Sequence, residues 1–317
     1  MSYAPATQPT FYFIGVTTGK SSIMRVFPAW AKHFGLKDAV IKGLDFPLHA
    51  DPAAYREAVS FIKLDPLSLG ALVTTHKIDL FRASSDLFDA IDPFAAKMHE
   101  TSCLSKRDGK LICHAKDPIT SKLAIDAFLP EGHFGRTGAE MFCMGAGGST
   151  IAMVGSLTQP SESKNFPSRI VVSDLDPRRL EEIRAIHGGG PAGTRIDYVL
   201  GQNAEANDAI LSQLKPGSFV VNATGLGKDR PGSPLTDAAV FPLDGYVWDL
   251  NYRGDLVFLK QARAQQTQQR LHVTDGWVYF IHGWTQVIAE VFAIPMPTSG
   301  TEFETVSRLA AEAAKAA

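Results

Sequence analysis

Residues 145–150, Gly-Ala-Gly-Gly-Ser-Thr, are the segment whose residue types and spacing most clearly indicate chemistry. They follow the apolar run Met141–Met144 and precede another that begins at Ile151, which predicts a strand, a tight turn and a helix. Glycines in such a turn let the backbone approach a pyrophosphate, and free amides at the helix start donate hydrogen bonds. Thr150 stands where the third glycine of the usual G-x-G-x-x-G pattern would fall. The residues that we expect to contact a dinucleotide here are Gly145, Ala146, Gly147, Gly148 and Ser149.

An acidic residue at the end of the next strand supports a dinucleotide site. The apolar run 169–173 leads into Asp174, where a carboxylate accepts hydrogen bonds from the adenosine ribose and repels the 2′-phosphate of NADP. NAD is therefore favoured over NADP. Two alternatives stay open: Arg178 and Arg179 are placed to hold a 2′-phosphate, and Asp174 could instead cap a helix that starts near Pro177.

Two later apolar runs also end in small or polar residues. The run 217–221 leads into Asn222, Ala223 and Thr224, and the run 245–248 leads into Asp249. Because the carboxyl ends of parallel strands line the ligand crevice of an open sheet, Asn222, Ala223 and Thr224 are predicted to contribute to the dinucleotide site.

Composition limits the class of protein. A chain of 317 residues with 45% hydrophobic residues is long enough for two cores. The formal net charge of −2 gives no reason to expect nucleic acid or an anionic membrane as a partner. The apolar runs have the length of strands, and the N-terminus lacks the features of a signal peptide, so we expect a cytoplasmic protein. The three cysteines and nine histidines lack metal-ligand spacing, so no metal is expected.

The chain before residue 120 has α/β patterning of its own. Strands are predicted at 11–14, 39–44 and 69–73, and a helix is predicted at 23–34, closed by Gly35. The same alternation continues after residue 120, so the sequence predicts two α/β domains in series.

Lys77, Ser102 and Asp117 are polar residues at predicted strand or loop ends of this first domain. The order of the segments that contain them resembles the shikimate and quinate dehydrogenase family over nearly the whole chain. The matching segments are Gly15 with Ser22, VTTHK at 73–77, TSCL at 101–104, Asp117, GAGG at 145–148, NATG at 222–225, DLNY at 249–252 and Gln286. Five departures lie where that family binds substrate. Ser102 replaces an asparagine, the segment from Thr74 to Lys77 is one residue short, and Gln286 lies further from Gly276. In addition, the first of two paired serines has no clean counterpart in residues 19–22, and residues 115–118 replace an Asn-Thr-Asp-Gly motif.

The resemblance implies a Rossmann-type, doubly wound dinucleotide-binding domain at 119–275. It also implies an α/β substrate domain at 1–118, completed by C-terminal helices at 276–317. The expected activity is NAD-dependent, reversible oxidation of a secondary hydroxyl on a shikimate-like or quinate-like acid. The residues that it implies for substrate binding are Ser22, Thr74, Ser102, Tyr252 and Gln286. It adds Leu250 and Gly276 to the cofactor site.

Lys77 and Asp117 are the catalytic residues that the resemblance implies. Hydride transfer from an alcohol requires that the hydroxyl proton leave too, so a titratable group must lie within hydrogen-bond reach of that oxygen. Lys77 is the expected proton acceptor, and Asp117 is expected to hold the ammonium and a substrate hydroxyl. His76 and His114 are alternative acceptors.

Two alternatives to this function remain. One is a dehydrogenase of the same fold with a different polyol or other small substrate. The other is a dinucleotide-sensing module without turnover, which would keep Asp174 but would not need Lys77 with Asp117. A small-molecule substrate is the expected partner, and a homodimer is possible.

Overall fold

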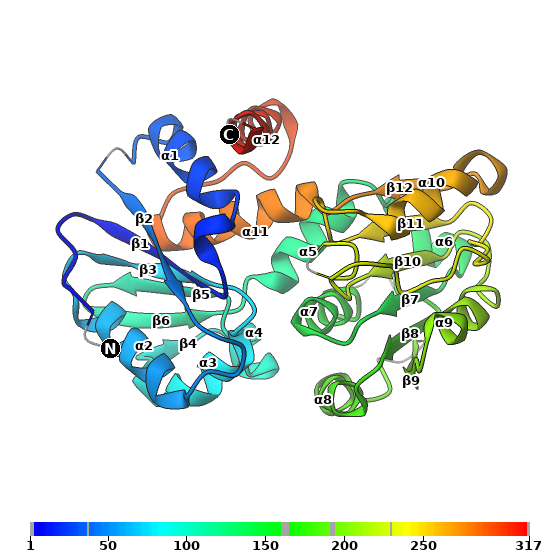
Figure 1. Cartoon of the computed structure of the whole chain (residues 1–317), viewed down its shortest axis with the longest axis horizontal. Coiled ribbons are helices and arrows are strands. Elements are labelled where there is room, and N and C mark those ends of the chain that lie inside the picture. Colours follow the sequence, from blue (N-terminus) through cyan, green and yellow to red (C-terminus); the bar gives the residue numbers. More distant parts are fainter. Residues whose placement is uncertain (1–2, 37, 160–164, 191–193, 229, 316–317) are drawn as a thin grey trace. The chain divides into compact units, whose positions relative to one another are not determined.

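The chain forms two compact units. A computed structural model describes residues 3–36, 38–159, 165–190, 194–228 and 230–315. The first unit consists of Met1–Thr120 with Ile281–Ala317, and the second consists of Ser121–Phe280 (Figure 1). Each unit is an α/β structure around one six-stranded sheet. The predicted α/β class is therefore confirmed.

The sheet of the first unit is mixed. Its strand order is β2-β1-β3-β5-β6-β4, with β5 antiparallel to both β3 and β6 and the other pairs parallel. Its strands are β1 (Thr10–Gly15), β2 (Val40–Asp45), β3 (Ser68–Val73), β4 (Ala90–Ile91), β5 (Cys103–Arg107) and β6 (Lys110–His114). Its helices are η1 (Thr18–Lys20), α1 (Ile23–His33), α2 (Pro52–Leu64), α3 (Lys77–Ser84), η2 (Ser85–Leu87) and α4 (Pro93–Met98).

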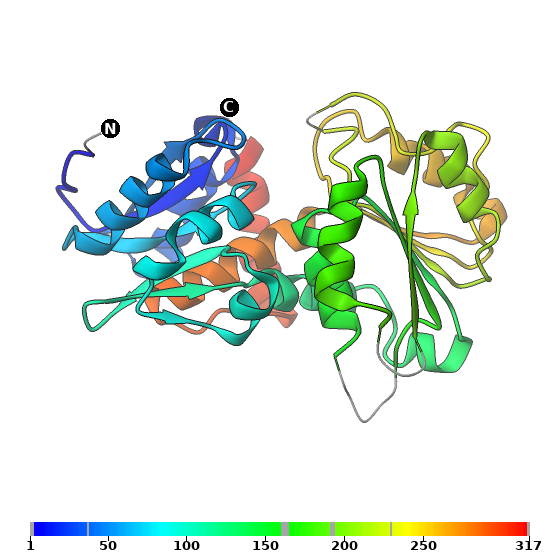
Figure 2. The ribbon, with the colours of Figure 1, turned by 90° about the horizontal axis from the view of Figure 1, so that it is seen from below.

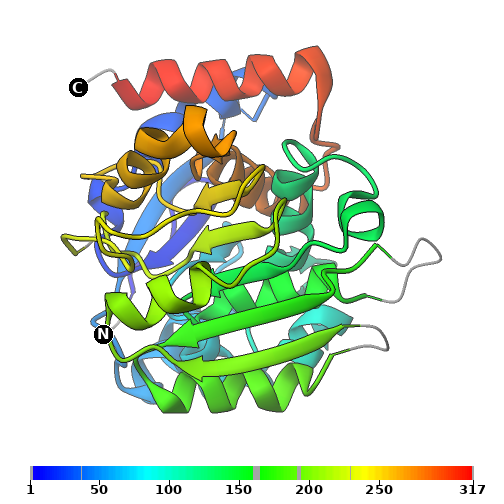
Figure 3. The ribbon, with the colours of Figure 1, turned by 90° about the vertical axis from the view of Figure 1, so that its right-hand side faces the viewer.

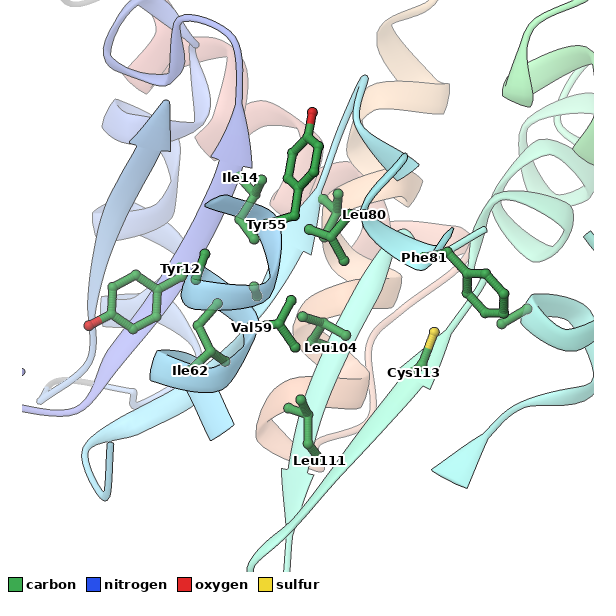
Figure 4. Close-up of a cluster of buried hydrophobic side chains, with 14 of the residues drawn as sticks. Tyr12, Ile14, Tyr55, Val59, Ile62, Leu80, Phe81, Leu104, Leu111 and Cys113 are labelled. Carbon is green, nitrogen blue, oxygen red and sulfur yellow. The ribbon is translucent and has the colours of Figure 1, made fainter. Parts of the chain in front are cut away.

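Alternate residues of β1 face opposite layers of the first unit. Tyr12 and Ile14 belong to a core cluster with Tyr55 and Val59 of α2 (Figure 4). Phe13, on the other face, packs edge-to-face on Trp284 of α11 (Trp277–Phe292), with ring centroids 4.9 Å apart. A strand buried on both faces explains why 11–14 reads as an unbroken apolar run.

The last helix, α12 (Gly300–Lys315), packs on α1. The Trp30 indole N–H, fully buried, donates to the Val306 carbonyl at 2.9 Å. Helix α12 and the part of α11 from Ile281 onward, red and orange in Figure 2, thus belong to the first unit. The boundary between the units falls within α11 and within α5 (Asp117–Asp126).

The sheet of the second unit is entirely parallel (Figure 3). Its order, β12-β11-β10-β7-β8-β9, is that of a doubly wound dinucleotide-binding sheet. Its strands are β7 (Met141–Met144), β8 (Arg169–Asp174), β9 (Arg195–Leu200), β10 (Phe219–Asn222), β11 (Tyr246–Asp249) and β12 (His272–Thr274). Its remaining helices are α6 (His133–Thr137), α7 (Gly148–Leu157), α8 (Pro177–His187), α9 (Ala204–Leu211) and α10 (Val257–Gln269).

Helices cover both faces of the second sheet. Phe142 of β7 belongs to a cluster that includes Leu211 of α9 and Phe258 of α10. Cys143, the next residue, faces the other way, and its Sγ lies 3.2 Å from Thr150 Oγ1 on α7. Residues predicted as strands at 141–144 and 169–173 lie in strands, as expected for a sheet buried on both sides.

Candidate functional site

Lys77 and Asp117 are in contact within the first unit. Each is the first residue of its helix, α3 and α5 respectively, and the Lys77 ammonium donates a hydrogen bond to Asp117 Oδ2. The side chains are only 17% and 10% exposed. Since water screens buried charges poorly, each of these charges depends strongly on the other. The structure thus joins the two residues that the sequence singled out for catalysis.

The turn between β3 and α3 sets the position of Lys77. The Thr74 amide donates to the Ile14 carbonyl at 3.0 Å, which ties the end of β3 to β1. Thr75 then adopts a left-handed conformation with φ 62°, and α3 begins two residues later, at Lys77. A β-branched residue in that region costs about 1–2 kcal/mol. The short segment from Thr74 to Lys77 is therefore a turn whose backbone is strained at Thr75.

Ser102 braces the segment that leads into Asp117. Its Oγ accepts a hydrogen bond from the Lys116 amide at 2.7 Å, and its own amide donates to the His114 carbonyl at 3.0 Å. Ser102 is 3% exposed. A hydroxyl that accepts one bond can still donate its proton, so Ser102 can hold this segment and also contact a ligand.

Gln286 lies on α11, one turn before Glu290. Both are half-buried, and Glu290 Oε2 accepts a hydrogen bond from Lys116 Nζ at 2.6 Å. This ion pair connects α11 to the residue next to Asp117. Sequence reasoning missed the pair, because neither Lys116 nor Glu290 lies in a recognisable motif.

The two histidines considered as alternative acceptors have internal partners. Nδ1 of His76, which is buried, lies 2.9 Å from the Tyr55 hydroxyl, and burial lowers the pKa of His76. His114 Nε2 lies 2.9 Å from Ser105 Oγ, and its Nδ1 lies 3.4 Å from Asp92 Oδ2. Ser105, His114 and Asp92 have the order of a hydrolase triad, but Ser105 is fully buried and no substrate carbonyl can reach it.

Thr18 occupies the space between the ends of β1 and β2. Its Oγ1 hydrogen-bonds Asp45 Oδ1 at 2.5 Å, and a Cβ on Gly43 would lie 1.9 Å from that Oγ1. A Cβ on Gly15 would lie 3.2 Å from the Thr74 methyl group, which places Thr74 at the same edge of the sheet.

Ser22, the residue before α1, makes no side-chain capping bond to its helix.

The glycine turn of the second unit lies at the point where the strand order reverses, between β7 and β10. Gly145 has φ 100°, and a Cβ there would lie 2.8 Å from the Ala223 carbonyl carbon. Both facts require glycine. Thr150 donates from Oγ1 to the Gly145 carbonyl at 2.5 Å. Thr150, which stands in the place of the third glycine, therefore stabilises the turn through this hydrogen bond.

The start of α7 offers amides on an accessible face. Gly147, Gly148 and Ser149 are half-buried, and a Cβ on Gly147 would meet no atom within 4 Å. Ala146 is buried, and its amide donates to Asp174 Oδ2 at 2.7 Å. A helix N-terminus of this kind suits a phosphate, because its amides and dipole both favour negative charge.

Asp176, and not Asp174, caps α8. Its carboxylate accepts from the Arg178 amide at 2.9 Å and pairs with the Arg178 guanidinium, also at 2.9 Å. Arg179 lies 3.2 Å from Glu182. Both arginines that could hold a 2′-phosphate thus have carboxylate partners. Asp174 accepts one bond at each oxygen, from Ala146 and Asp176, and keeps lone pairs for further donors.

Asn222 braces the loop after β10. It is fully buried, its Oδ1 accepts from Thr224 Oγ1 at 2.7 Å, and its Nδ2 donates to Asp249 Oδ1 at 3.2 Å. Burial raises the pKa of Asp249 to about 6. Gly276 is required by close approach, since a Cβ would lie 2.0 Å from the Leu250 carbonyl oxygen. Asn222 thus connects the carboxyl ends of β10 and β11 by hydrogen bonds. Ala223, Thr224 and Leu250, which follow these ends, are half-buried.

The predicted substrate residues fall in both units. Ser22, Thr74, Ser102 and Gln286 belong to the first unit, and Tyr252 belongs to the second. The Tyr252 ring packs against Trp277 and Phe280, with centroids 5.4 and 4.8 Å away. Trp284 instead packs in the first unit's core, so the aromatic residues of α11 do not form one cluster.

No helix in the described ranges is long and apolar enough to cross a membrane. No group of three or more His, Cys, Asp or Glu side chains in the same ranges could hold a metal ion.

The strand order and glycine turn place the chain in the class of α/β proteins with a Rossmann-type unit. Over 96–98% of its length, the chain has the fold of solved shikimate dehydrogenases, with TM-scores between 0.67 and 0.72. A family of enzymes with that fold was the expectation from sequence, and the fold is confirmed.

Three solved structures illustrate the range of that fold. Shikimate dehydrogenase from Thermus thermophilus, in complex with NADP(H) and shikimate, is 19% identical, with 96% of this chain and 99% of that chain covered and a TM-score of 0.67. Quinate dehydrogenase from Corynebacterium glutamicum, in complex with NAD, is 18% identical over 96% and 98%, with a TM-score of 0.69. The 5-ketofructose reductase of Gluconobacter sp. strain CHM43 is 17% identical over 96% and 98%, with a TM-score of 0.66. No protein-family model and no curated sequence matches the chain.

Proposed function

We propose that this chain is a dehydrogenase that reversibly oxidises a secondary hydroxyl of a hydroxylated acid of the shikimate or quinate type, with NAD as cofactor. The contact between Lys77 and Asp117 is the observation that carries the proposal. A dinucleotide-sensing module would need the glycine turn and Asp174 but would not need a buried ammonium–carboxylate pair. The first unit would hold the substrate, and the second would hold the dinucleotide.

Lys77 would exchange the proton of the reacting hydroxyl. A bound nicotinamide ring would supply the hydride acceptor, and the proton of the substrate hydroxyl would have to pass to a protein group within hydrogen-bond reach of that oxygen. The unprotonated Lys77 amine takes that proton and becomes an ammonium, which Asp117 stabilises. In the reverse direction the ammonium returns the proton to the alkoxide oxygen.

The second unit's residues would hold NAD. Gly147, Gly148 and Ser149 are half-buried residues at the start of α7, where backbone amides suit a pyrophosphate. Asp174 would accept the ribose hydroxyls through its free lone pairs. The preference for NAD rests on that carboxylate and on the carboxylate partners of Arg178 and Arg179. Among enzymes with this fold, the quinate dehydrogenase was solved with NAD and the Thermus enzyme with NADP(H).

The polar residues near Lys77 and Asp117 in the first unit would bind the substrate. Ser102 is braced beside Asp117, and Thr74 lies next to the end of β1. Ser22 and Gln286 would contribute further hydrogen bonds, and Tyr252 would do so from the second unit. Hydroxyl and amide groups of this kind suit a substrate that carries several hydroxyls.

A different polyol substrate is the second candidate. The shortened turn, with Thr75 at φ 62°, and the engagement of Ser102 with Lys116 lie where the substrate would bind. The similarity to a 5-ketofructose reductase supports this candidate, because that enzyme combines the same fold with a different named substrate.

An absorbance assay for NADH formation tests both candidates. Purified chain is supplied with NAD, and separately with NADP, against shikimate, quinate, other hydroxylated ring acids, sugars and polyols. Turnover of shikimate or quinate supports the first candidate, and turnover only of sugars or polyols supports the second. Bound NAD by calorimetry without turnover of any alcohol in the panel would contradict the dehydrogenase proposal.

A further inference from the structure

Glu290 of α11 is a carboxylate that contacts basic side chains from neighbouring segments of the first unit. Its Oε2 accepts a hydrogen bond from Lys116 Nζ at 2.6 Å. Its Oε1 lies 3.6 Å from Nε2 of His114, on β6, and 3.9 Å from the guanidinium of Arg107, on β5. The Arg107 guanidinium also donates a hydrogen bond to the Glu290 carbonyl. These contacts hold both the side chain and the backbone of Glu290, although the proposed reaction gives it no part.

The neighbours of Glu290 keep its carboxyl group ionised. Burial opposes ionisation, but the hydrogen bond from Lys116, with His114 and Arg107 nearby, outweighs burial and holds the pKa of Glu290 below its usual value. The side chains of Lys116 and Glu290 are 13% and 27% exposed, so water screens their charges only in part. The contact between them is therefore an ion pair of the folded chain at neutral pH.

Lys116 connects this ion pair to the proposed catalytic residues. It precedes Asp117, which begins α5 and accepts the hydrogen bond from the Lys77 ammonium. The Lys116 amide donates to Ser102 Oγ at 2.7 Å, and the Lys116 carbonyl accepts from the Thr120 amide at 2.9 Å. Lys116 is therefore held at its amide, its carbonyl and its ammonium. The backbone from which the Asp117 side chain extends has correspondingly little freedom to move.

The other end of the ion pair lies on a helix that carries a predicted substrate residue. Gln286 stands four residues before Glu290 on α11, and residues at this spacing lie on the same side of a helix. Both are half-buried, whereas Val287 and Val291, the residues that follow them, are buried in the first unit. The ion pair thus joins the side of α11 that carries Gln286 to the segment that carries Asp117.

We propose that Glu290 is a positioning residue, which acts through Lys116 to keep Asp117 in contact with the Lys77 ammonium. This inference rests on the proposed role of Lys77 as proton acceptor. Glu290 exchanges no proton with the substrate. Its ion pair restrains the start of α5, so that the Asp117 carboxylate stays where it holds Lys77.

The first test observes the Lys77 ammonium without substrate or dinucleotide. In a chain with ¹⁵N-labelled lysine, the ammonium resonance that disappears in Lys77→Arg belongs to Lys77. A hydrogen-bonded ammonium exchanges its protons with water mainly when the contact opens, and the exchange rate at about pH 6 can be measured by NMR. Glu290→Gln keeps the length of the side chain and removes its charge. We expect exchange at Lys77 to be about threefold faster, or more, in this variant.

Two controls separate this effect from a general loosening of the fold. The Lys63 ammonium, which donates to the Leu87 carbonyl and to Asp89, is seen in the same spectra, and its exchange rate should not change. Glu302→Gln removes an exposed carboxylate that lies 3.8 Å from His33, where α12 meets α1. It is the matched control for the substitution itself, and its Lys77 exchange rate should equal that of the wild type.

The second test is a double-mutant cycle on kcat, with an alcohol that the wild type oxidises. Glu290→Gln should lower kcat about tenfold or more, because proton transfer depends on the position of Lys77, and should leave NAD affinity unchanged. In the Asp117→Asn chain the same substitution should lower kcat less than about twofold, because the contact that Glu290 supports is already lost. Glu290→Asp, which keeps the charge, should retain more turnover than Glu290→Gln.

Two results would overturn the inference. One is a Lys77 ammonium that exchanges equally fast in wild type and Glu290→Gln, or too fast to observe in both. The other is an equal decrease of kcat by Glu290→Gln in the presence and absence of the Asp117 carboxylate, which would show a general structural role. A chain that oxidises no alcohol would refute the proposed function, and the NMR measurement would still decide whether Glu290 holds the Lys77–Asp117 contact.

Discussion

The Lys77 ammonium donates a hydrogen bond to Asp117, forty positions further along the chain, and each residue begins a helix. The two helix positions have opposite effects on the stability of the charged side chains. A carboxylate in the first turn of α5 is stabilised by the helix dipole, whereas an ammonium in the first turn of α3 is destabilised by its own helix. Asp117 therefore supplies a negative charge beside an ammonium that its own helix does not stabilise.

Thr75→Asn should stabilise the chain. Thr75 is exposed and left-handed, with φ 62°, and asparagine tolerates that conformation better than a β-branched residue. We expect an increase of about 0.5–1 kcal/mol in the free energy of unfolding, measured by urea denaturation. Thr17→Asn is the control, because Thr17 is exposed at φ −142°. A loss of stability in Thr75→Asn would show that the turn is not strained.

Gly145→Ala and Gly147→Ala should have different effects. At Gly145 a Cβ would meet the Ala223 backbone at 2.8 Å with φ 100°, so we expect a loss of about 2 kcal/mol or more in unfolding free energy. At Gly147 nothing lies within 4 Å and φ is −78°, so folding should be unchanged while NAD affinity falls. Denaturation and NAD titration by calorimetry measure the two effects. Unchanged NAD affinity in a folded Gly147→Ala would contradict pyrophosphate binding at this turn.

Asp174→Ala should weaken NAD relative to NADP. It removes the carboxylate that would accept the ribose hydroxyls and repel a 2′-phosphate. We expect the ratio of the two dissociation constants to shift toward NADP by about tenfold, the effect of about 1.4 kcal/mol. Asp38→Ala, at an exposed position of the first unit, should leave the ratio unchanged. An unchanged ratio in Asp174→Ala would assign the preference to Arg178 or Arg179.

Local patterns in the sequence predicted the strands of the second unit well. Strands such as β7 and β8 are buried on both faces, so they read as apolar runs, and the turn after β7 requires glycine at position 145 for steric reasons. Both signals depend on neighbouring residues in the chain. Patterns of that kind can be recognised in a single sequence.

Contacts between distant residues could not be read in the same way. The β5–β6 hairpin has a local cause, left-handed Asp108 and Gly109, but its place beside β3 does not. Glu100 looks like an ordinary surface acid in the sequence, and only the fold shows that it is buried. The Lys116–Glu290 pair joins residues 174 positions apart, which no local pattern indicates.

Turnover of Lys77→Ala tests the central claim most directly. With NAD and an alcohol that the wild type oxidises, we predict a decrease in kcat of about 10²–10⁴-fold, with NAD affinity by calorimetry nearly unchanged. Lys97→Ala, at an exposed lysine of α4, should keep wild-type turnover. If Lys77→Ala oxidises the alcohol at the wild-type rate, Lys77 is not the proton acceptor and the proposed mechanism is wrong.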